Sequence, residues 1–211
     1  MKISVLTILP EMYTLLNSSI IGRALQNNAF EVQVIDIREY STDKHKKCDD
    51  SPFGGGAGMV MTPQPIHDAI MAIDPEHLAY RIYLSPKGSI LNQKKVLELS
   101  SIEHILLVSG CYEGIDERII QLDIDAELSI GDYVLMSGDL ASLVVINTVA
   151  RYLPNVLGSE ESTQEESFSN GLLEYPHYTR PRDFMGLKVP DVLLSGNHEK
   201  IKVWRQSESL R

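Results

Sequence analysis

Residues 104–152 read HILLVSGCYEGIDERIIQLDIDAELSIGDYVLMSGDLASLVVINTVARY, and this stretch decides the fold class. An apolar run at His104 to Val108 precedes a predicted helix at Ile115 to Leu122, and a second run at Glu127 to Ile130 precedes one at Asp139 to Tyr152. Short apolar runs of this kind predict buried strands. Strands that alternate with helices indicate an α/β domain with a mainly parallel sheet. The last helix is rich in Leu, Val and Ile, which predicts nearly complete burial.

The residues before position 104 continue this alternation. Strands are expected at Ile3 to Leu9, at Val32 to Ile37 and at Arg81 to Leu84, the last closed by a turn at Ser85 to Gly88. Helices are expected at Met12 to Gln26 with a weak point at Gly22, at Pro63 to Ile73, and at Asn92 to Leu99 with Asn92 as the N-cap. The segment from Arg38 to Gly58 has no periodicity and predicts a long loop, which in a compact domain is usually functional or disordered.

Composition limits the class of protein. The 211 residues carry a formal net charge of −10, so a non-specific coat of nucleic acid is not expected. Two cysteines, Cys48 and Cys111, can form neither a disulfide framework nor a zinc knuckle, which favours a reducing compartment. The apolar run Leu140 to Ala150 is too short to span a bilayer, and the first apolar run stops at Pro10, too early for an export signal. A cytoplasmic location without membrane contact is therefore expected.

The composition changes after the last long helix. Residues Asn155 to Asn170 are rich in Ser and Glu, which is typical of a flexible linker. The expected organisation is an α/β domain at 1–158, a linker at 159–170, and a short C-terminal segment at 171–211 that is irregular to Pro190 and helical from Glu199 to Leu210. The C-terminal segment has a small excess of Lys and Arg, and Lys44 to Lys47 is a second basic spot, so local docking of nucleic acid stays open.

Three of the predicted strands end in turns that contain glycine. These turns are Ser85 to Gly88, Ser109 to Gly114, and Gly131 to Leu135. In open α/β sheets ligands bind beyond the carboxyl ends of the strands, so the three turns together would surround one ligand with free backbone groups. For any single turn, the alternative is that the glycine simply ends a strand.

The segment Asp49 to Met59, DDSPFGGGAGM, contains four glycines. No Gly-Lys-Ser/Thr follows, and Met59 stands where a dinucleotide motif needs its third glycine, so both phosphate-binding patterns are excluded. Glycines do let a backbone approach a flat or bulky partner closely. A flexible surface loop is the alternative.

Several polar residues are open to two interpretations. Arg151 ends the apolar helix, where the helix dipole alone favours a cation. Glu165 and Glu166 could belong to a solvated run of charge. His177 and Tyr178 suit stacking on a nucleotide or hydrogen bonding to it, although this pattern is weak by itself.

Five segments together resemble one known family: DDSPFGGGAGMVM at 49–61, YEGIDER at 112–118, SIGDYVL at 129–135, GLLEYPHYTRP at 171–181 and VPDVLLSGNHEKI at 189–201. The similarity is to bacterial tRNA (guanine-N(1)-)-methyltransferases, the TrmD family, and it extends from LPEMY at 9–13 to the last residues. It implies a SPOUT-class α/β fold, with a mainly parallel sheet, a deep C-terminal trefoil knot and an apparently truncated C-terminal helical appendage. Composition and spacing alone give no sign of a knot.

The resemblance also implies a cofactor, partners and site residues. The methyl donor would be S-adenosylmethionine, Mg2+ is a further candidate requirement, and no residue is assigned as a metal ligand. The matching donor-binding positions are Tyr83, Leu84, Ser85, Pro86, Gly110, Tyr112, Glu113, Ile130, Gly131, Asp132, Tyr133, Val134 and Leu135. The tRNA substrate would contact Asp49, Gly55, His177 and Tyr178. The protein would be a homodimer in which each active site is shared between the subunits.

The implied reaction methylates ring nitrogen 1 of the guanine immediately 3′ of the anticodon in tRNA. That nitrogen carries a proton at neutral pH, so a base must remove the proton as the methyl group arrives. Glu166 matches the family's catalytic aspartate, and Arg151 matches an arginine that would stabilise charge on the guanine carbonyl oxygen. A linker that orders over the substrate would account for a catalytic acid in this segment.

The chain departs from the family pattern at a few positions. Glu166 is one methylene longer than the usual aspartate, Ser109-Gly110-Cys111 replaces Cys-Gly-Arg/His, and Met136 to Leu140, MSGDL, replaces Ser/Thr-Gly-Gly-Glu-Leu. The chain stops at Arg211, before the basic segment and helical bundle of typical members. These departures leave open a diverged, weakly active or inactive donor- or RNA-binding module that needs a partner for the missing region. A third alternative is a diverged module that has also lost the ability to bind the donor.

Overall fold

The computed structural model describes residues 1–157, 167–168 and 172–210. The chain divides into two compact units, Met1–Gly158 and Ser159–Arg211, and each is described here by itself. Glu165 and Glu166 lie outside the described residues. Among the helices that the structure describes, none has both the length and the apolar character needed to cross a membrane.

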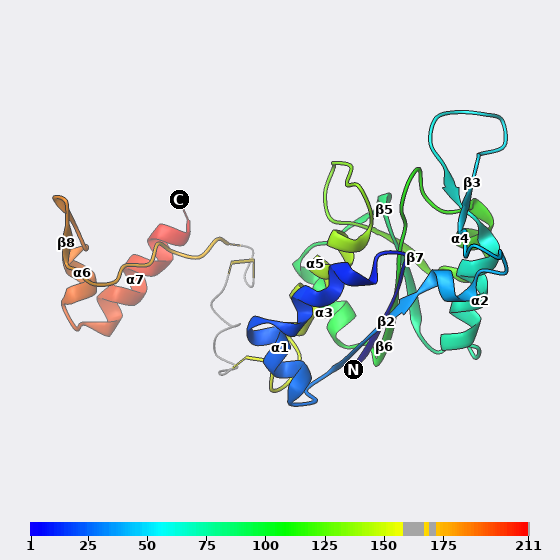
Figure 1. Ribbon diagram of the computed structural model, residues 1–211. Helices are drawn as coiled ribbons and strands as arrows, with labels where there is room; N and C mark the ends of the chain where they lie inside the picture. The colour runs from blue at the N-terminus through cyan, green and yellow to red at the C-terminus, as the bar shows by residue number, and fades with distance from the viewer. Residues whose placement is uncertain (158–166, 169–171, 211) are drawn as a thin grey trace. The chain divides into compact units, whose positions relative to one another are not determined.

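Five parallel strands form the central sheet of the first unit, in the order β2-β1-β6-β5-β7 (Figure 1). The strands are β1 (Lys2–Thr7), β2 (Glu31–Asp36), β5 (Tyr80–Ile90), β6 (His104–Ser109) and β7 (Ala126–Ser129). The short strands β3 (Asp49–Asp50) and β4 (Val60–Met61) form a separate antiparallel pair. The predicted α/β class with a mainly parallel sheet is confirmed.

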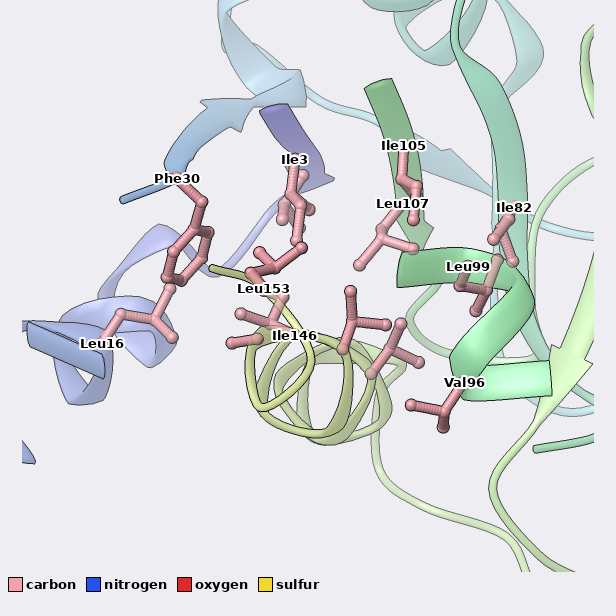
Figure 2. Packing of buried hydrophobic residues seen from close by; sticks show 14 of the residues in the cluster. Ile3, Leu16, Phe30, Ile82, Val96, Leu99, Ile105, Leu107, Ile146 and Leu153 are labelled. Atoms are coloured by element: carbon pink, nitrogen blue, oxygen red, sulfur yellow. The ribbon is translucent and has the colours of Figure 1, made fainter. Parts of the chain in front are cut away.

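Helices cover both faces of this sheet (Figure 1). One face carries η1 (Pro10–Asn17), α1 (Ser19–Gln26), α3 (Gln93–Ser100) and α5 (Asp139–Ala150). The other carries η2 (Ile37–Tyr40), α2 (Pro63–Ile73) and α4 (Glu117–Asp123). Side chains alternate along each strand, so Ile105 and Leu107 enter the first core while Leu106 and Val108 enter the second. Figure 2 shows Ile105 and Leu107 facing α5, as expected of a parallel sheet that is apolar on both faces.

The helix expected at Met12 to Gln26 is two helices in the structure. A 3-10 helix, η1, ends at Asn17, and α1 begins at Ser19, whose φ of 62° breaks the helical path. The break therefore precedes Gly22, where the sequence predicted the weak point. Gly22 instead allows close packing, because a Cβ there would lie 2.5 Å from the Asn17 carbonyl group.

The predicted turn at Ser85 to Gly88 lies inside β5 and does not end it. The strand continues to Ile90, and its pairing with β7 shifts register between Leu84 and Ser89. Gly88 makes this possible, since a Cβ there would lie 2.3 Å from the backbone nitrogen of Leu128. The expectation of a closing turn was wrong because the glycine serves close approach of two strands.

Three smaller expectations also change. Helix α4 begins at Glu117, two residues late, because the Asp116 side chain caps it by accepting a hydrogen bond from the Arg118 amide. Helix α5 is buried on one side only, with Leu140 and Val144 45% and 38% exposed. Within the predicted loop from Arg38 to Gly58, the structure has η2 and β3.

The second unit has little secondary structure before its last helix. Strands β8 (Asp183–Phe184) and β9 (Leu187–Lys188) form a hairpin inside the segment expected to be irregular, and α6 (Asp191–Leu194) and α7 (His198–Ser209) follow. The Trp204 ring on α7 lies 6.5 Å from the Tyr175 ring and 6.3 Å from the Tyr178 ring, centroid to centroid. Arg205 stacks over Tyr175 at 4.7 Å.

A buried ion pair stabilises the start of β5 in the first unit. Arg81 Nε donates to Asp74 Oδ2 at 2.8 Å, and both side chains are only 3% exposed. Burial alone would raise the pKa of Asp74, but hydrogen bonds from Arg81 and from the amides of Leu78 and Ala79 outweigh it and lower that pKa.

Asp74→Asn is therefore expected to lower the free energy of unfolding at pH 7 by about 3 kcal/mol, since it removes the nearer counter-charge of the buried Arg81 and leaves only the Asp123 carboxylate at 3.9 Å. Because the pKa of Asp74 is lower in the folded than in the unfolded protein, the ionised carboxylate stabilises the fold at pH values above its unfolded pKa of about 4. This contribution is lost as the pH falls through the folded pKa. Urea unfolding from pH 7 to pH 3 measures both effects.

The matched control is Glu98→Gln, which removes an exposed carboxylate paired with Lys95 and should leave stability nearly unchanged. Equal losses of unfolding free energy in the two variants would contradict the stabilising role of the Asp74–Arg81 pair. An Asp74→Asn variant whose stability changes with pH as in the wild type would contradict it too.

Candidate functional site

A cavity of about 190 Å3 opens beside the middle of β5 and at the ends of β6 and β7, where the loop at 130–138 leads into α5. The predicted turns after β6 and β7 therefore meet around one pocket, together with Ser85 and Pro86 inside β5. All of the expected donor-binding residues except Asp132 line it, namely Tyr83, Leu84, Ser85, Pro86, Gly110, Tyr112, Glu113, Ile130, Gly131, Tyr133, Val134 and Leu135. Sequence reasoning missed other lining residues, which are Cys111, Gly114, Leu128, Ser129, Met136, Ser137, Gly138 and Ala141.

Glycines shape the walls of this cavity. A Cβ on Gly110 would lie 2.9 Å from the Tyr83 ring, and a Cβ on Gly138 would lie 3.1 Å from the Gly110 nitrogen. The Gly138 amide donates to the Gly110 carbonyl at 2.7 Å, so the two walls touch. Gly131 has a φ of +156°, in the region that side chains disfavour.

The segment with four glycines, Asp49 to Met59, is called the glycine loop here, and hydrogen bonds join it and the following strand β4 to residues that line the cavity. The Glu113 amide donates to the Met59 carbonyl at 3.0 Å, and the Met61 amide donates to the Gly114 carbonyl at 2.9 Å. Gly58 has a φ of +80°, and a Cβ there would lie 2.5 Å from Glu113 Oε1. The loop and the Glu113 wall are thus one connected structure.

Asp49 and Gly55 both belong to this connected structure. Asp49 pairs with Met61 across the β3–β4 ladder. Burial, followed by the nearby Asp49 carboxylate, raises the pKa of the Tyr112 phenol, which places Asp49 beside a residue that lines the cavity. Gly55 is exposed, has a φ of +79°, and has open space where a Cβ would point. The structure therefore places Asp49 beside a residue of the cavity wall, and Gly55 on the exposed part of the loop that is hydrogen-bonded to this wall.

Arg151 lies elsewhere in the first unit. It is the C-cap of α5 and lines a second cavity with residues of η1 and α1, among them Leu15 and Ile20. The first cavity is at the opposite end of α5. The 12 residues of this helix span about 18 Å. Within one chain, Arg151 and the first cavity are therefore far apart.

The expected residues of the second unit are held by local contacts. His177 Nε2 lies 2.9 Å from Glu174 Oε1, and the His177 ring lies 4.9 Å from the Tyr175 ring. Tyr178 is about half exposed. Glu166 lies outside the described residues.

A buried polar cluster under the first cavity was missed by sequence reasoning. Asp139, the first residue of α5, accepts hydrogen bonds from Thr7 at 2.6 Å, from Tyr13 at 3.0 Å and from Ser137 at 2.7 Å. An aspartate that begins an apolar helix is a recognisable sequence signal. Its partners Thr7 and Tyr13 were not predictable, because they are 132 and 126 residues away.

Comparison with known proteins gives a consistent result. A family model described as tRNA (Guanine-1)-methyltransferase TrmD matches residues 1–211. A tRNA (guanine-N(1)-)-methyltransferase of Carboxydothermus hydrogenoformans is 55% identical over all of this chain and 83% of its own length. Relatives of the same name from Clostridioides difficile and Ruminiclostridium cellulolyticum are 54% and 55% identical over all of this chain and 93% and 91% of theirs. The chain belongs to the tRNA (guanine-1)-methyltransferase TrmD family.

Proposed function

We propose that this chain transfers the methyl group of S-adenosylmethionine to ring nitrogen 1 of the guanine immediately 3′ of the anticodon in tRNA. The relatives named tRNA (guanine-N(1)-)-methyltransferase support the reaction class, because they match the entire chain at more than half identity. The observation that carries the proposal is the cavity beside β5 and at the ends of β6 and β7, which gathers the expected donor-binding residues except Asp132.

The residues of this cavity suit S-adenosylmethionine. Leu84, Leu128 and Leu135 offer apolar walls for a purine, and the Glu113 carboxylate can face the positive charge of the donor. When bound, the donor supplies an electrophilic methyl group on a positively charged sulfur. The glycines in the cavity walls let the backbone approach the donor closely.

Residues of the chain itself supply the base, the charge stabilisation and the contacts to tRNA. Glu166 accepts the proton from nitrogen 1 of guanine, so that the ring nitrogen becomes nucleophilic as it takes up the methyl group. Arg151 stabilises negative charge on the guanine carbonyl oxygen. Asp49 and Gly55 of the glycine loop, together with His177 and Tyr178, hold the tRNA bases. Magnesium dependence belongs to the same proposal and is measured by adding and chelating Mg2+ in the assay.

The proposal includes a homodimer with shared active sites. About 18 Å of α5 separates Arg151 from the donor cavity of the same chain, which is too far for both to act on one guanine. A two-fold partner can bring its own Arg151 to this cavity. The distance along α5 is the support for this part of the proposal.

The test is methyl incorporation into a tRNA transcript with guanine 3′ of the anticodon, against a matched transcript with adenine there, alongside calorimetric titration of the donor. Methylation of the first transcript only is the expected result. Donor binding without turnover at high enzyme concentration would contradict the proposed activity and favour a non-catalytic module. No donor binding at all would also overturn the donor site.

Gly58→Ala is expected to weaken donor binding about tenfold. Its Cβ would collide with Glu113 Oε1 and displace that side chain from the cavity wall. Gly54→Ala is the matched control, since Gly54 has a similar φ of +86° but open space around its Cβ. Calorimetry measures both dissociation constants. Similar losses in the two variants would mean that backbone strain, not the Glu113 contact, is responsible.

A further inference from the structure

The cluster around Asp139 is a closed network of buried hydroxyls. Asp139 Oδ1 accepts from Thr7 and Tyr13, and Asp139 Oδ2 accepts from Ser137. The network extends from the Tyr13 hydroxyl to Ser109 Oγ at 2.9 Å, and from there to Ser142 Oγ at 2.7 Å. Asp139 is 1% exposed, and its partners are buried or half-buried. Few natural cores bury a carboxylate without a reason beyond packing, because desolvation of the charge is costly.

The network holds both walls of the donor cavity. Ser137 lies in one wall and directly precedes Gly138, whose amide donates to the Gly110 carbonyl at 2.7 Å. Ser109 directly precedes Gly110, which lies in the opposite wall. Thr7 and Tyr13 anchor the carboxylate from β1 and η1, neither of which lines the cavity. Thr7 and Tyr13 therefore hold the Asp139 carboxylate from outside the cavity, whereas the segments that this carboxylate positions form the cavity walls.

The electrostatics keep this arrangement fixed near neutral pH. Burial, followed by the Asp139 carboxylate, raises the pKa of the Tyr13 phenol, so Tyr13 remains a hydrogen-bond donor. A carboxylate at the first residue of α5 also interacts favourably with the helix dipole. The three hydroxyls supply hydrogen bonds to the charged group, which are stronger than those to a neutral one.

We propose that Asp139 is a positioning residue for the donor site. Held by Thr7 and Tyr13, its carboxylate fixes the wall at 136–138 against the wall at 109–111 before the donor arrives. Cavity walls that are already ordered bind the donor more tightly, because the entropy cost of ordering them is met when the protein folds. The identity of the ligand as S-adenosylmethionine rests on the proposed function.

The test uses Tyr13→Phe and Thr7→Val, which each remove a donor to Asp139 and keep the shape of the side chain. Tyr13→Phe also removes the contact to Ser109, and Thr7→Val also removes the acceptor of the Leu9 amide. Each variant is expected to raise the dissociation constant of S-adenosylmethionine about tenfold by calorimetry. In steady-state assays the KM for the donor should rise by the same factor, while kcat at saturating donor and the KM for tRNA change less than twofold.

A second readout does not depend on activity. Cys111 lies in the wall at 109–111, its Sγ is 4.0 Å from the Met136 carbonyl oxygen, and the other cysteine, Cys48, is buried. Alkylation of Cys111, followed by peptide mass spectrometry without donor, should be several-fold faster in Tyr13→Phe and Thr7→Val, because their walls are less ordered.

The control is Tyr152→Phe, which removes a hydroxyl that contacts Gln93 Nε2 and lies past the other end of α5. It should leave donor affinity and Cys111 labelling at wild-type values. If Tyr152→Phe matches the two test variants, or if those variants lose only thermal stability, the positioning role is overturned. A wild-type protein that binds no S-adenosylmethionine would instead overturn the proposed function.

Discussion

Glu166→Gln is expected to lower the rate of methyl transfer at saturating donor and tRNA by about 10²- to 10⁴-fold. Glutamine keeps the size of the side chain but cannot accept the proton that leaves nitrogen 1 of guanine. Donor affinity should not change, because the part of the chain that the structure describes supplies the lining of the donor cavity from residues between Tyr83 and Ala141. Single-turnover methylation, with calorimetry in parallel, measures both quantities.

Glu166→Asp is the companion variant, since it keeps a carboxylate and shortens the side chain by one methylene. Substantial activity in Glu166→Asp beside an inactive Glu166→Gln would identify the charge as the requirement. A Gln variant with the full wild-type rate would exclude Glu166 as the base. A shift in donor affinity would give this residue a binding role instead.

Two impaired variants, Arg151→Ala and Gly110→Ala, are expected to restore activity when they are combined in one dimer. Arg151→Ala alone should slow transfer by about 10²- to 10³-fold, by removing charge stabilisation. Gly110→Ala alone should lose donor binding, because the new Cβ would lie 2.9 Å from the Tyr83 ring in the cavity wall. In a mixed dimer with shared sites, one site pairs an intact cavity with an intact arginine.

After unfolding and refolding of an equal mixture, about a quarter of wild-type activity is expected, since half of the dimers are mixed and each has one working site. Gly110→Ala mixed with Gly138→Ala is the control, because both changes affect the donor cavity and no mixed dimer has an intact site. Native mass spectrometry confirms that mixed dimers form. Mixed dimers without recovered activity, or a monomeric protein, would contradict the shared site.

The sequence predicted the elements that obey local rules. Pro63–Ile73 has the expected helix bounds, and Asn92 caps α3 by accepting a hydrogen bond from the Lys95 amide at 3.0 Å. The alternation of strands and helices correctly indicated the parallel sheet. The turns after β6 and β7 were correctly expected to meet, because the carboxyl ends of parallel strands lie at one edge of the sheet.

The misplaced elements depend on distant contacts. Gly88 and Gly22 suggested a turn and a weak point, but both serve close approach to backbone that the local pattern cannot reveal. The exposed side of α5 also carries large apolar residues, Leu140 and Val144, so apolar composition could not distinguish it from the buried side. Two of the three hydrogen-bond donors to Asp139, Thr7 and Tyr13, come from the other end of the chain. Sequence patterns find elements and turns, whereas tertiary contacts decide what a buried polar side chain does.

The place of β1 inside the sheet has a consequence for biosynthesis. One neighbour, β2, follows closely, but the other, β6, begins at His104. At ribosomal speeds of about 5–20 residues per second, β1 waits roughly 5 to 20 s for this second neighbour. Throughout this interval one edge of an apolar strand is open to other nascent chains, so a larger supply of chaperones should raise the yield of this protein.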